Sequence, residues 1–194
     1  MIKIYLTRHG QTQSNVDRLM QGWADTPLTP LGLQQGQRLG EQLRSVPFSK
    51  IYCSPSPRAY QTASLINVFQ QTEIIPTKGL KEMHFGQLEL KKEPEGKTWQ
   101  QLLLRDWTDI GGNNLDIVAK QMHTTMDTIV HTAKDNTNIL CVTHCFSILS
   151  FLSIIDQPFF EQCLNNDDKV ENCRLTILQY EKGQYSIEAF NESI

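Results

Sequence analysis

Four basic side chains stand just beyond short apolar runs of this sequence: Arg8, His9, Arg58 and His144. The guanidinium groups of the two arginines stay charged at any working pH and offer paired donors that match phosphoryl oxygens. A histidine can accept a phosphoryl group, which divides a difficult transfer into two easier steps. If each side chain only capped a helix or paired locally, basic residues with unrelated local roles would have to stand by chance at three separate strand ends. We therefore expect these residues to form one phosphate pocket.

The elements that must position these residues alternate between strand-like and helix-like patterns. Apolar runs rich in β-branched or aromatic residues span 2–6, 50–53 and 139–143, and helical patterns follow the second and third at 59–69 and 146–152. This alternation predicts a three-layer α/β/α sandwich around a mostly parallel sheet. In such sheets ligands bind at the carboxyl ends of the strands, where the four basic residues stand.

The rest of the chain supplies further elements. Thr29 and Pro30 read as the N-cap and first turn of a helix, and a longer helix is expected at about 114–133. Residues 175–180 and 185–187 are typical of a strand pair. We find no internal repeat or domain linker, so residues 1–194 are expected to form a single domain.

Residues 91–113 form the least regular segment. A Lys-Lys-Glu-Pro-Glu-Gly-Lys opening is typical of a loop, and 98–107 has the pattern of a short amphipathic helix. Segments of this kind often cover functional sites. We therefore expect 91–113 to be an excursion over the active-site face of the sheet.

Composition limits the partners. Of 194 residues, 39% are hydrophobic and 20% charged, and the net charge is −3 without a basic tail. No electrostatic signature of binding to nucleic acid or an anionic membrane is present. The N-terminus turns polar by Thr7, and no apolar run approaches the ~20 residues that span a bilayer. We expect a cytoplasmic protein whose five cysteines are reduced thiols.

Two other mechanisms of phosphoryl transfer compete with a histidine nucleophile. Cys53 precedes Arg58, as in the tyrosine-phosphatase loop, but only four residues separate them and Cys53 falls within the strand. A metal cofactor is not expected either, because His123 and His131 each stand four residues from Asp127 on a solvated helix face without ligand spacing. His9 is left as the candidate nucleophile.

The segment Arg-His-Gly-Gln-Thr-Gln-Ser-Asn at residues 8–15 resembles the Arg-His-Gly-x-Thr-x-x-Asn signature of the histidine phosphatase superfamily, the phosphoglycerate mutase-like proteins. Further similar segments occur in the same order and spacing over most of the chain. They lie at 21–22, 27–32, 53–63, 80–86, 142–144 and Asn172.

The resemblance implies a role for each matching residue. His9 is the nucleophile that becomes phosphohistidine, while Arg8, Arg58 and His144 hold the phosphoryl group and its transition state. Glu82 protonates the leaving oxygen and then activates water, although no pattern in the residues themselves singles it out. The substrate would be a small phosphorylated metabolite, and no cofactor is implied. Further pocket residues are Asn15, Gln21, Gly22 and Cys145.

The sequence departs from the family pattern where substrate selectivity is expected to arise. Cys145 replaces a common glycine, Gly-Asn-Asn at 112–114 replaces Gly-Glu-Ser, and residues 85–90 read Phe-Gly-Gln-Leu-Glu-Leu in place of Phe-Gly-x-Trp-Glu-Gly. His84 replaces a residue that is commonly acidic, and either touches substrate or packs. Trp23 either stacks on a substrate ring or packs inward.

Three functions remain open on these residues. The first is a metal-independent phosphomonoesterase that acts through phosphohistidine. The second is a phosphoglycerate mutase-type isomerase, which returns the phosphoryl group to its substrate; the short stretch between Glu82 and His144 leaves limited room for a substrate-enclosing insertion. The third is a non-catalytic phosphate-binding module, which would have no need of a general acid.

Overall fold

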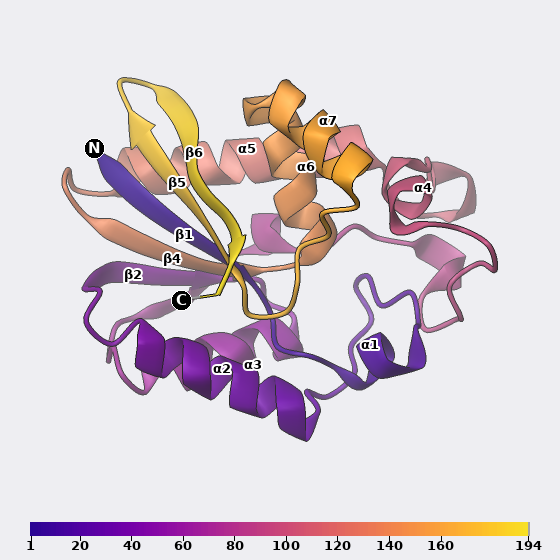
Figure 1. The fold of residues 1–194 in the computed structure, drawn as a ribbon, viewed down its shortest axis with the longest axis horizontal. Coiled ribbons are helices and arrows are strands. Elements are labelled where there is room, and N and C mark those ends of the chain that lie inside the picture. The colour runs from indigo at the N-terminus through magenta and orange to yellow at the C-terminus, as the bar shows by residue number, and fades with distance from the viewer. Residues whose placement is uncertain (194) are drawn as a thin grey trace.

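The computed structural model describes residues 1–193 and places a six-stranded sheet between two layers of helices (Figure 1). The elements in chain order are β1 (Ile2–Arg8), α1 (Gln13–Asp17), α2 (Pro30–Gln42), β2 (Phe48–Cys53), α3 (Pro57–Asn67), β3 (Ile74–Pro76), η1 (Lys78–Leu80), η2 (Gly86–Leu88), α4 (Trp99–Leu104), η3 (Thr108–Ile110), α5 (Leu115–Thr132), β4 (Asn138–Thr143), α6 (Cys145–Ile155), α7 (Gln157–Asn166), β5 (Leu175–Glu181) and β6 (Gln184–Glu192). The predicted α/β sandwich is confirmed.

The sheet has the strand order β3-β2-β4-β1-β5-β6. Strands β3, β2, β4 and β1 are parallel, and β5 and β6 extend the sheet in antiparallel pairings. Arg8 at the end of β1 pairs with Thr143 at the end of β4, and Cys53 at the end of β2 pairs with Val142. The three strand ends therefore meet at one edge, as a mostly parallel sheet requires.

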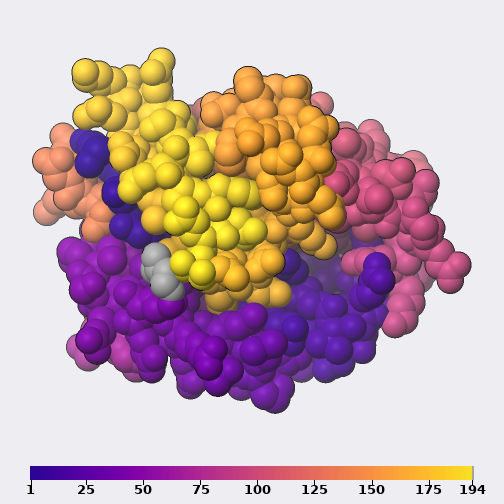
Figure 2. Space-filling view, in the orientation of Figure 1, coloured from indigo at the N-terminus to yellow at the C-terminus, as the bar shows by residue number. Residues whose placement is uncertain are grey.

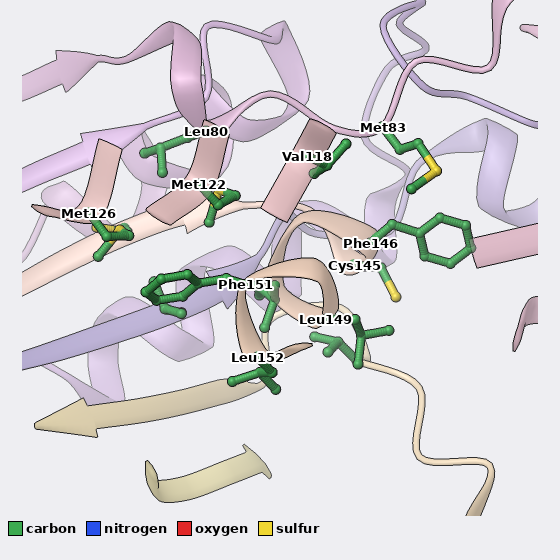
Figure 3. Close-up of a cluster of buried hydrophobic side chains, with 14 of the residues drawn as sticks. Leu80, Met83, Val118, Met122, Met126, Cys145, Phe146, Leu149, Phe151 and Leu152 are labelled. Atoms are coloured by element: carbon green, nitrogen blue, oxygen red, sulfur yellow. The ribbon is translucent and has the colours of Figure 1, made fainter. Parts of the chain in front are cut away.

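Two hydrophobic cores form because alternate side chains of a strand point to opposite faces. Leu140 and Val142 of β4 pack with α2 and α3, whereas Ile139 and Cys141 pack with α5 and α6. Figure 1 shows these helix pairs on opposite sides of the sheet. Figure 3 shows part of the second core, with side chains that include Val118, Met122, Met126, Leu149, Phe151 and Leu152.

Besides the short 3₁₀ turns η1, η2 and η3, the elements α1, β3 and α7 were not predicted from the sequence. Helix α1 and strand β3 span only five and three residues, which is too short for a periodic signal. Helix α7 begins at an Asp156 side chain that accepts the Phe159 N–H, with a proline in its first turn. That start signal was present in the sequence, but the neighbouring apolar pattern of α6 concealed a new helix.

The segment 91–113 contains α4 and η3 and contributes Glu93 and Leu102 to a cavity wall at the strand ends. Helix α4 begins with a capping box between Thr98 and Gln101 and ends at Leu104, earlier than predicted. The indole of Trp107 instead turns into the core and donates to the Leu102 carbonyl at 3.1 Å. The organisation of 1–194 as a single domain stays a prediction. No helix within residues 1–193 combines the length and apolarity needed to cross a membrane.

Candidate active site

A cavity of about 80 Å³ lies at the carboxyl ends of the parallel strands. Figure 2 shows the molecular surface hollowed where the indigo N-terminal segment faces the orange segment near residue 170. A second cavity, of about 560 Å³, adjoins the first and shares Arg8, Asn15 and Lys169 with it. Eight of the nine site residues predicted from the sequence lie on the wall of the first cavity: Arg8, His9, Asn15, Gln21, Gly22, Arg58, Glu82 and Cys145.

His9 is buried directly after β1, and one of its ring nitrogens is already engaged in a hydrogen bond. Its Nδ1 lies 2.8 Å from the carbonyl oxygen of Gly10, and because a carbonyl only accepts, Nδ1 must carry the hydrogen. Nε2 therefore holds the lone pair. Burial, followed by the charges of Arg58 and Arg8, lowers the pKa of His9 well below its ordinary value. The result is a neutral imidazole whose free lone pair suits a nucleophile.

The turn after His9 is held by a close approach of two backbone segments. A Cβ atom added to Gly10 would lie 2.4 Å from the carbonyl oxygen of Gly32, so only glycine fits there. The Gly10 N–H donates to Thr62 Oγ1 at 3.0 Å, and that hydroxyl donates to the carbonyl of Arg58 at 2.8 Å. Thr62 thus connects the end of β1 to the first turn of α3.

Arg58 uses all five of its side-chain N–H groups on protein atoms, and only 2% of its surface is exposed. Its acceptors are His9 Nε2 at 3.2 Å, His144 Nδ1 at 3.2 Å, the carbonyl oxygens of Gly22 at 2.7 Å and Ala24 at 2.8 Å, and Asp25 Oδ1 at 2.7 Å. The Asp25 carboxylate balances the buried charge. The guanidinium therefore orients both histidines and holds the loop at 22–25.

A second anchor holds the same loop from its other side. Glu89 accepts the N–H groups of Trp23 and Ala24, both at 2.7 Å. Gly22 has a φ of +52°, and a Cβ there would lie 2.3 Å from Glu89 Oε1. Glu89 belongs to the segment at 85–90 that departs from the family pattern, and it keeps the family's glutamate. The loop is therefore clamped between a carboxylate and the Arg58 guanidinium.

Trp23 and His84 pack against each other, with ring centroids 4.5 Å apart, and neither side chain lies on either cavity wall. The Trp23 indole donates to the Glu82 carbonyl oxygen at 2.8 Å. Lys81 Nζ lies 3.5 Å from the centre of the Trp23 ring, a cation–π distance. This geometry favours a packing role for His84. Trp23 stacks on His84 but stays 44% exposed, so it does not pack inward, and its contact with a substrate ring stays a prediction.

His144 is the one predicted site residue that lies behind the cavity wall. Arg58 always donates, so His144 Nδ1 must accept and Nε2 must carry the hydrogen. That Nε2–H is buried and has no hydrogen-bond partner within residues 1–193. Burial, followed by the charge of Arg58, lowers the pKa of His144 well below its ordinary value. The rings of His144 and His9 lie 5.2 Å apart.

Glu82 caps helix α6 from a distant part of the chain. His144, the N-cap residue of α6, makes no side-chain cap, and Glu82 takes its place. Glu82 Oε2 accepts the Phe146 N–H at 3.3 Å, while Oε1 accepts the Met83 N–H at 2.9 Å and the Ser147 N–H at 3.0 Å. Because 64 residues separate Glu82 from Phe146, no local pattern could have revealed the pairing.

The remaining predicted wall residues differ in what they can offer a ligand. Asn15 Oδ1 accepts the Thr12 N–H at 3.1 Å, which leaves its amide Nδ2 as the free donor. Gln21 is committed at both ends of its amide, to Thr12 at 3.0 Å and to Thr26 at 3.1 Å, and so supports the wall. Cys145 lies in the first turn of α6, where burial raises the pKa of its thiol. The thiol is therefore neutral.

The weaker alternatives considered from the sequence find no place at the cavity. Cys53 is fully buried in the core beneath α2 and α3, where burial raises the pKa of its thiol to about 12. His123 Nδ1 lies 3.1 Å from Asp127 Oδ2, and His131 is exposed on the same helix. Within residues 1–193, no three His, Cys, Asp or Glu side chains are grouped so as to hold a metal ion.

Sequence reasoning missed several residues of the cavity wall. Lys169, in the loop after α7, lies on both cavity walls. Leu102 of α4 and Phe146 of α6 give the first cavity an apolar side. These residues carry no sequence signal, because a lone lysine in a loop and an apolar residue on a helix face occur in most proteins.

Comparison with known proteins identifies the family and agrees with the fold. The family model of the histidine phosphatase superfamily (branch 1) matches residues 4–193, and the chain belongs to this family. A relative from Salmonella paratyphi A, named "Probable phosphoglycerate mutase GpmB", is 28% identical over 195 residues, covering 95% of this chain and 88% of the relative.

Two solved structures resemble this one over nearly their full lengths. Phosphoserine phosphatase from Entamoeba histolytica, in complex with 3-phosphoglyceric acid, has 28% identity and a TM-score of 0.81, covering 100% of this chain and 98% of that chain. The alpha-ribazole phosphatase from Shigella flexneri has 26% identity and a TM-score of 0.81, covering 98% of this chain and 96% of that chain.

Proposed function

We propose that this protein is a metal-independent phosphatase that hydrolyses a small phosphomonoester through a phosphohistidine on His9. The observation that carries the proposal is the state of His9: its Nδ1–H is held by the Gly10 carbonyl, and its Nε2 lone pair points at the guanidinium of Arg58. A neutral nucleophile beside a buried cation is what attack on an anionic phosphoryl group requires.

In the first step, His9 Nε2 attacks phosphorus, and the bond from phosphorus to the ester oxygen breaks with its electron pair on that oxygen. Arg8 and Arg58 stabilise the charge on the phosphoryl oxygens. Arg8 keeps a buried Nε–H that has no partner within residues 1–193. His144 offers its buried Nε2–H in the same way. Because every N–H of Arg58 already has an acceptor, a phosphoryl oxygen must share or displace one of them.

Glu82 handles the protons in both steps. It gives a proton to the departing ester oxygen, which leaves as an alcohol. In the second step it takes a proton from the water that attacks phosphorus, the bond from His9 Nε2 to phosphorus breaks, and inorganic phosphate leaves. Its carboxylate is on the cavity wall, and hydrogen bonds from α6 hold it in place, which supports this role.

A mutase is the second candidate, and the name of the Salmonella relative favours it. The names of the Entamoeba and Shigella proteins favour a phosphatase. The apolar side of the cavity, formed in part by Leu102 and Phe146, suits the carbon part of a small substrate. An assay that measures free phosphate and isomer separately, with a panel of phosphomonoesters and 3-phosphoglycerate, distinguishes the two reactions.

A rapid quench with ³²P-labelled phosphomonoester tests the proposed nucleophile. The wild-type protein should yield an acid-labile, alkali-stable adduct on His9, with and without a chelator. His131→Ala is the matched control, because His131 is an exposed histidine on α5, and it should label normally. Labelling that persists in His9→Ala would disprove the nucleophile, and chelator-sensitive turnover restored by a divalent metal would disprove the metal-free mechanism.

A further inference from the structure

The hydroxyl of Ser147 lies between two acceptors at the start of helix α6. Its Oγ is 3.1 Å from Glu82 Oε1 and 2.9 Å from the carbonyl oxygen of Lys81, and the residue is fully buried. We propose that Ser147 is a positioning residue for Glu82: by its hydrogen bond to Oε1, Ser147 directs the proton that Glu82 exchanges with the substrate to Oε2. The proposal rests on the proposed role of Glu82 as acid and base.

The two oxygens of Glu82 are held unequally. Oε1 has three donors, the N–H of Met83, the N–H of Ser147 and the Ser147 hydroxyl, at 2.9 to 3.1 Å. Oε2 has the single N–H of Phe146 at the longer distance of 3.3 Å. A carboxyl proton on Oε1 would have to displace one of three donors. The proton therefore resides on Oε2, which keeps free lone-pair capacity on the cavity wall.

The Ser147 hydroxyl can change its hydrogen-bond acceptor when Glu82 gains or loses a proton. It has one hydrogen and can donate to only one of its two neighbours at a time. When Glu82 is ionised, a charge-assisted bond to Oε1 is the stronger choice. When Oε2 carries the proton, the charge is gone and the Lys81 carbonyl becomes the better acceptor. A turn of the hydroxyl thus accompanies each proton transfer, and no heavy atom has to move.

Substitution of Ser147 leaves the charged surroundings of Glu82 in place. Arg58 and Glu82 line the same cavity and attract each other through their opposite charges. Cys145 comes directly before Phe146 and Ser147, whose N–H groups donate to the Glu82 carboxylate. Within residues 1–193, the charged and titratable groups that share the cavity or the adjoining chain with Glu82 are Arg58 from α3, Arg8 and His9 from the end of β1, His144 and Cys145 at the start of α6, Lys81 beside it in the chain, Glu93 from the segment at 91–113 and Lys169 from the loop after α7. An effect of Ser147→Ala on proton transfer therefore reports the lost hydroxyl.

The test is the pH dependence of the two chemical steps in single turnovers of an alkyl phosphate. Formation of the phosphoenzyme needs protonated Glu82, and hydrolysis of the phosphoenzyme needs ionised Glu82. Ser147→Ala removes a hydrogen-bond donor to the ionised form of Glu82. In plots of rate against pH, the basic limb of phosphoenzyme formation and the acidic limb of phosphoenzyme hydrolysis should therefore both shift to higher pH by about one unit. Ser147→Cys, with a weaker donor, should move both limbs less.

Ser150→Ala provides the matched control. Ser150 lies one turn later in α6, is fully buried, and its hydroxyl has no hydrogen-bond partner within residues 1–193. Loss of this hydroxyl should leave both limbs where they are. In a Glu82→Gln background, Ser147→Ala should cause no further change in phosphoenzyme formation, because the group it acts through is gone. Unfolding temperature and vanadate affinity report whether each variant keeps its fold and phosphate pocket.

Each outcome supports or overturns the inference. The inference is supported if both limbs of the pH profiles shift most in Ser147→Ala, less in Ser147→Cys and not at all in Ser150→Ala, relative to wild type. Superimposable profiles for Ser147→Ala and wild type, with normal turnover, overturn the role of Ser147 and leave the proposed function standing. Equal shifts in Ser147→Ala and Ser150→Ala show a general packing effect and also overturn it. A wild-type protein that neither forms phosphoenzyme nor releases phosphate overturns the proposed function, and this inference with it.

Discussion

Arg58 donates its Nε–H to His9 Nε2 across 3.2 Å, so the atom proposed to attack phosphorus is held by the arginine proposed to bind the phosphoryl group. Both residues are buried, and each depends on the other for its orientation. The bond must break when a nitrogen–phosphorus bond forms, because the same lone pair serves both. The freed Arg58 Nε–H then faces the phosphoryl group.

The first prediction concerns the geometry of this arginine. Lysine at position 58 would keep the charge, but its three donors cannot replace the five bonds to His9, His144 and the loop at 22–25. Arg58→Lys should lower turnover by about 10²-fold, the scale of losing a preorganised donor. Steady-state rates with one phosphomonoester check this. Near-normal turnover would show that Arg58 acts only as a diffuse charge.

Arg18→Lys serves as the control for this substitution. Within residues 1–193, the side chain of Arg18 makes a single ion pair, with Glu93 at 3.4 Å, and it is 77% exposed. The same chemical change at that position should leave turnover nearly unchanged, because exposed ion pairs contribute little.

The second prediction concerns the leaving group. An alkyl phosphate expels a strongly basic alkoxide, so a positioned acid should contribute about 10²–10⁴-fold, whereas a nitrophenyl phosphate expels a stable phenolate. Glu82→Gln should therefore slow phosphoenzyme formation from the alkyl ester far more than from the aryl ester. Single-turnover bursts measure both rates.

The amide of Glu82→Gln keeps an oxygen that can accept the N–H groups of α6, so loss of the helix cap should not dominate the result. Equal losses of phosphoenzyme formation for the two esters would mean that Glu82 only shapes the pocket. The acid would then have to be sought among the other titratable residues of the cavity wall.

The third prediction concerns stability against pH. The pKa values of His9 and His144 are lowered in the native protein, mainly by burial. Above about pH 6.5 both histidines are neutral in the native and unfolded states and have no differential effect. As the pH falls below that value, the two histidines bind protons in the unfolded chain but not in the native protein. Stability should therefore be lost, at up to about 1.4 kcal/mol per pH unit for each histidine.

Urea unfolding between pH 7 and pH 5 measures this slope. His9→Asn should make the loss of unfolding free energy with falling pH shallower by about 1.4 kcal/mol per pH unit at most, because one proton uptake is removed. His131→Asn, at an exposed position of α5, is the control and should leave the slope unchanged. Parallel curves for wild type and His9→Asn would contradict the prediction.

Local patterns were sufficient for most of the fold. Strands β1, β2 and β4 and helices α5 and α6 were predicted because buried strands and amphipathic helices repeat their apolar residues with different periods. The predicted ends of these elements differ from the structure by only a few residues. Short elements such as β3 carry no period and were missed.

The sequence by itself also predicted which residues of the proposed phosphate site come together at one edge of the sheet. Arg8 ends β1, His9 follows it, and Arg58 lies in the first turn of α3 after β2. Parallel strands bring their carboxyl ends to one edge whatever the details of packing. The same argument placed His144 at this edge. Its position behind Arg58, with Nε2–H unpartnered within the described chain, depends on how the side chains pack.

Only the tertiary structure decided how the protons and the cavity wall are arranged. Glu82 in a loop and Ser147 at a helix start are in contact because α6 follows β4 and packs against the segment after η1. Lys169, from the loop after α7, lines the same cavity as Glu82. Contacts between residues more than 60 positions apart have no local periodicity to reveal them. The choice between two oxygens of one carboxylate is a matter of a few tenths of an ångström, and packing of the whole molecule sets distances on that scale.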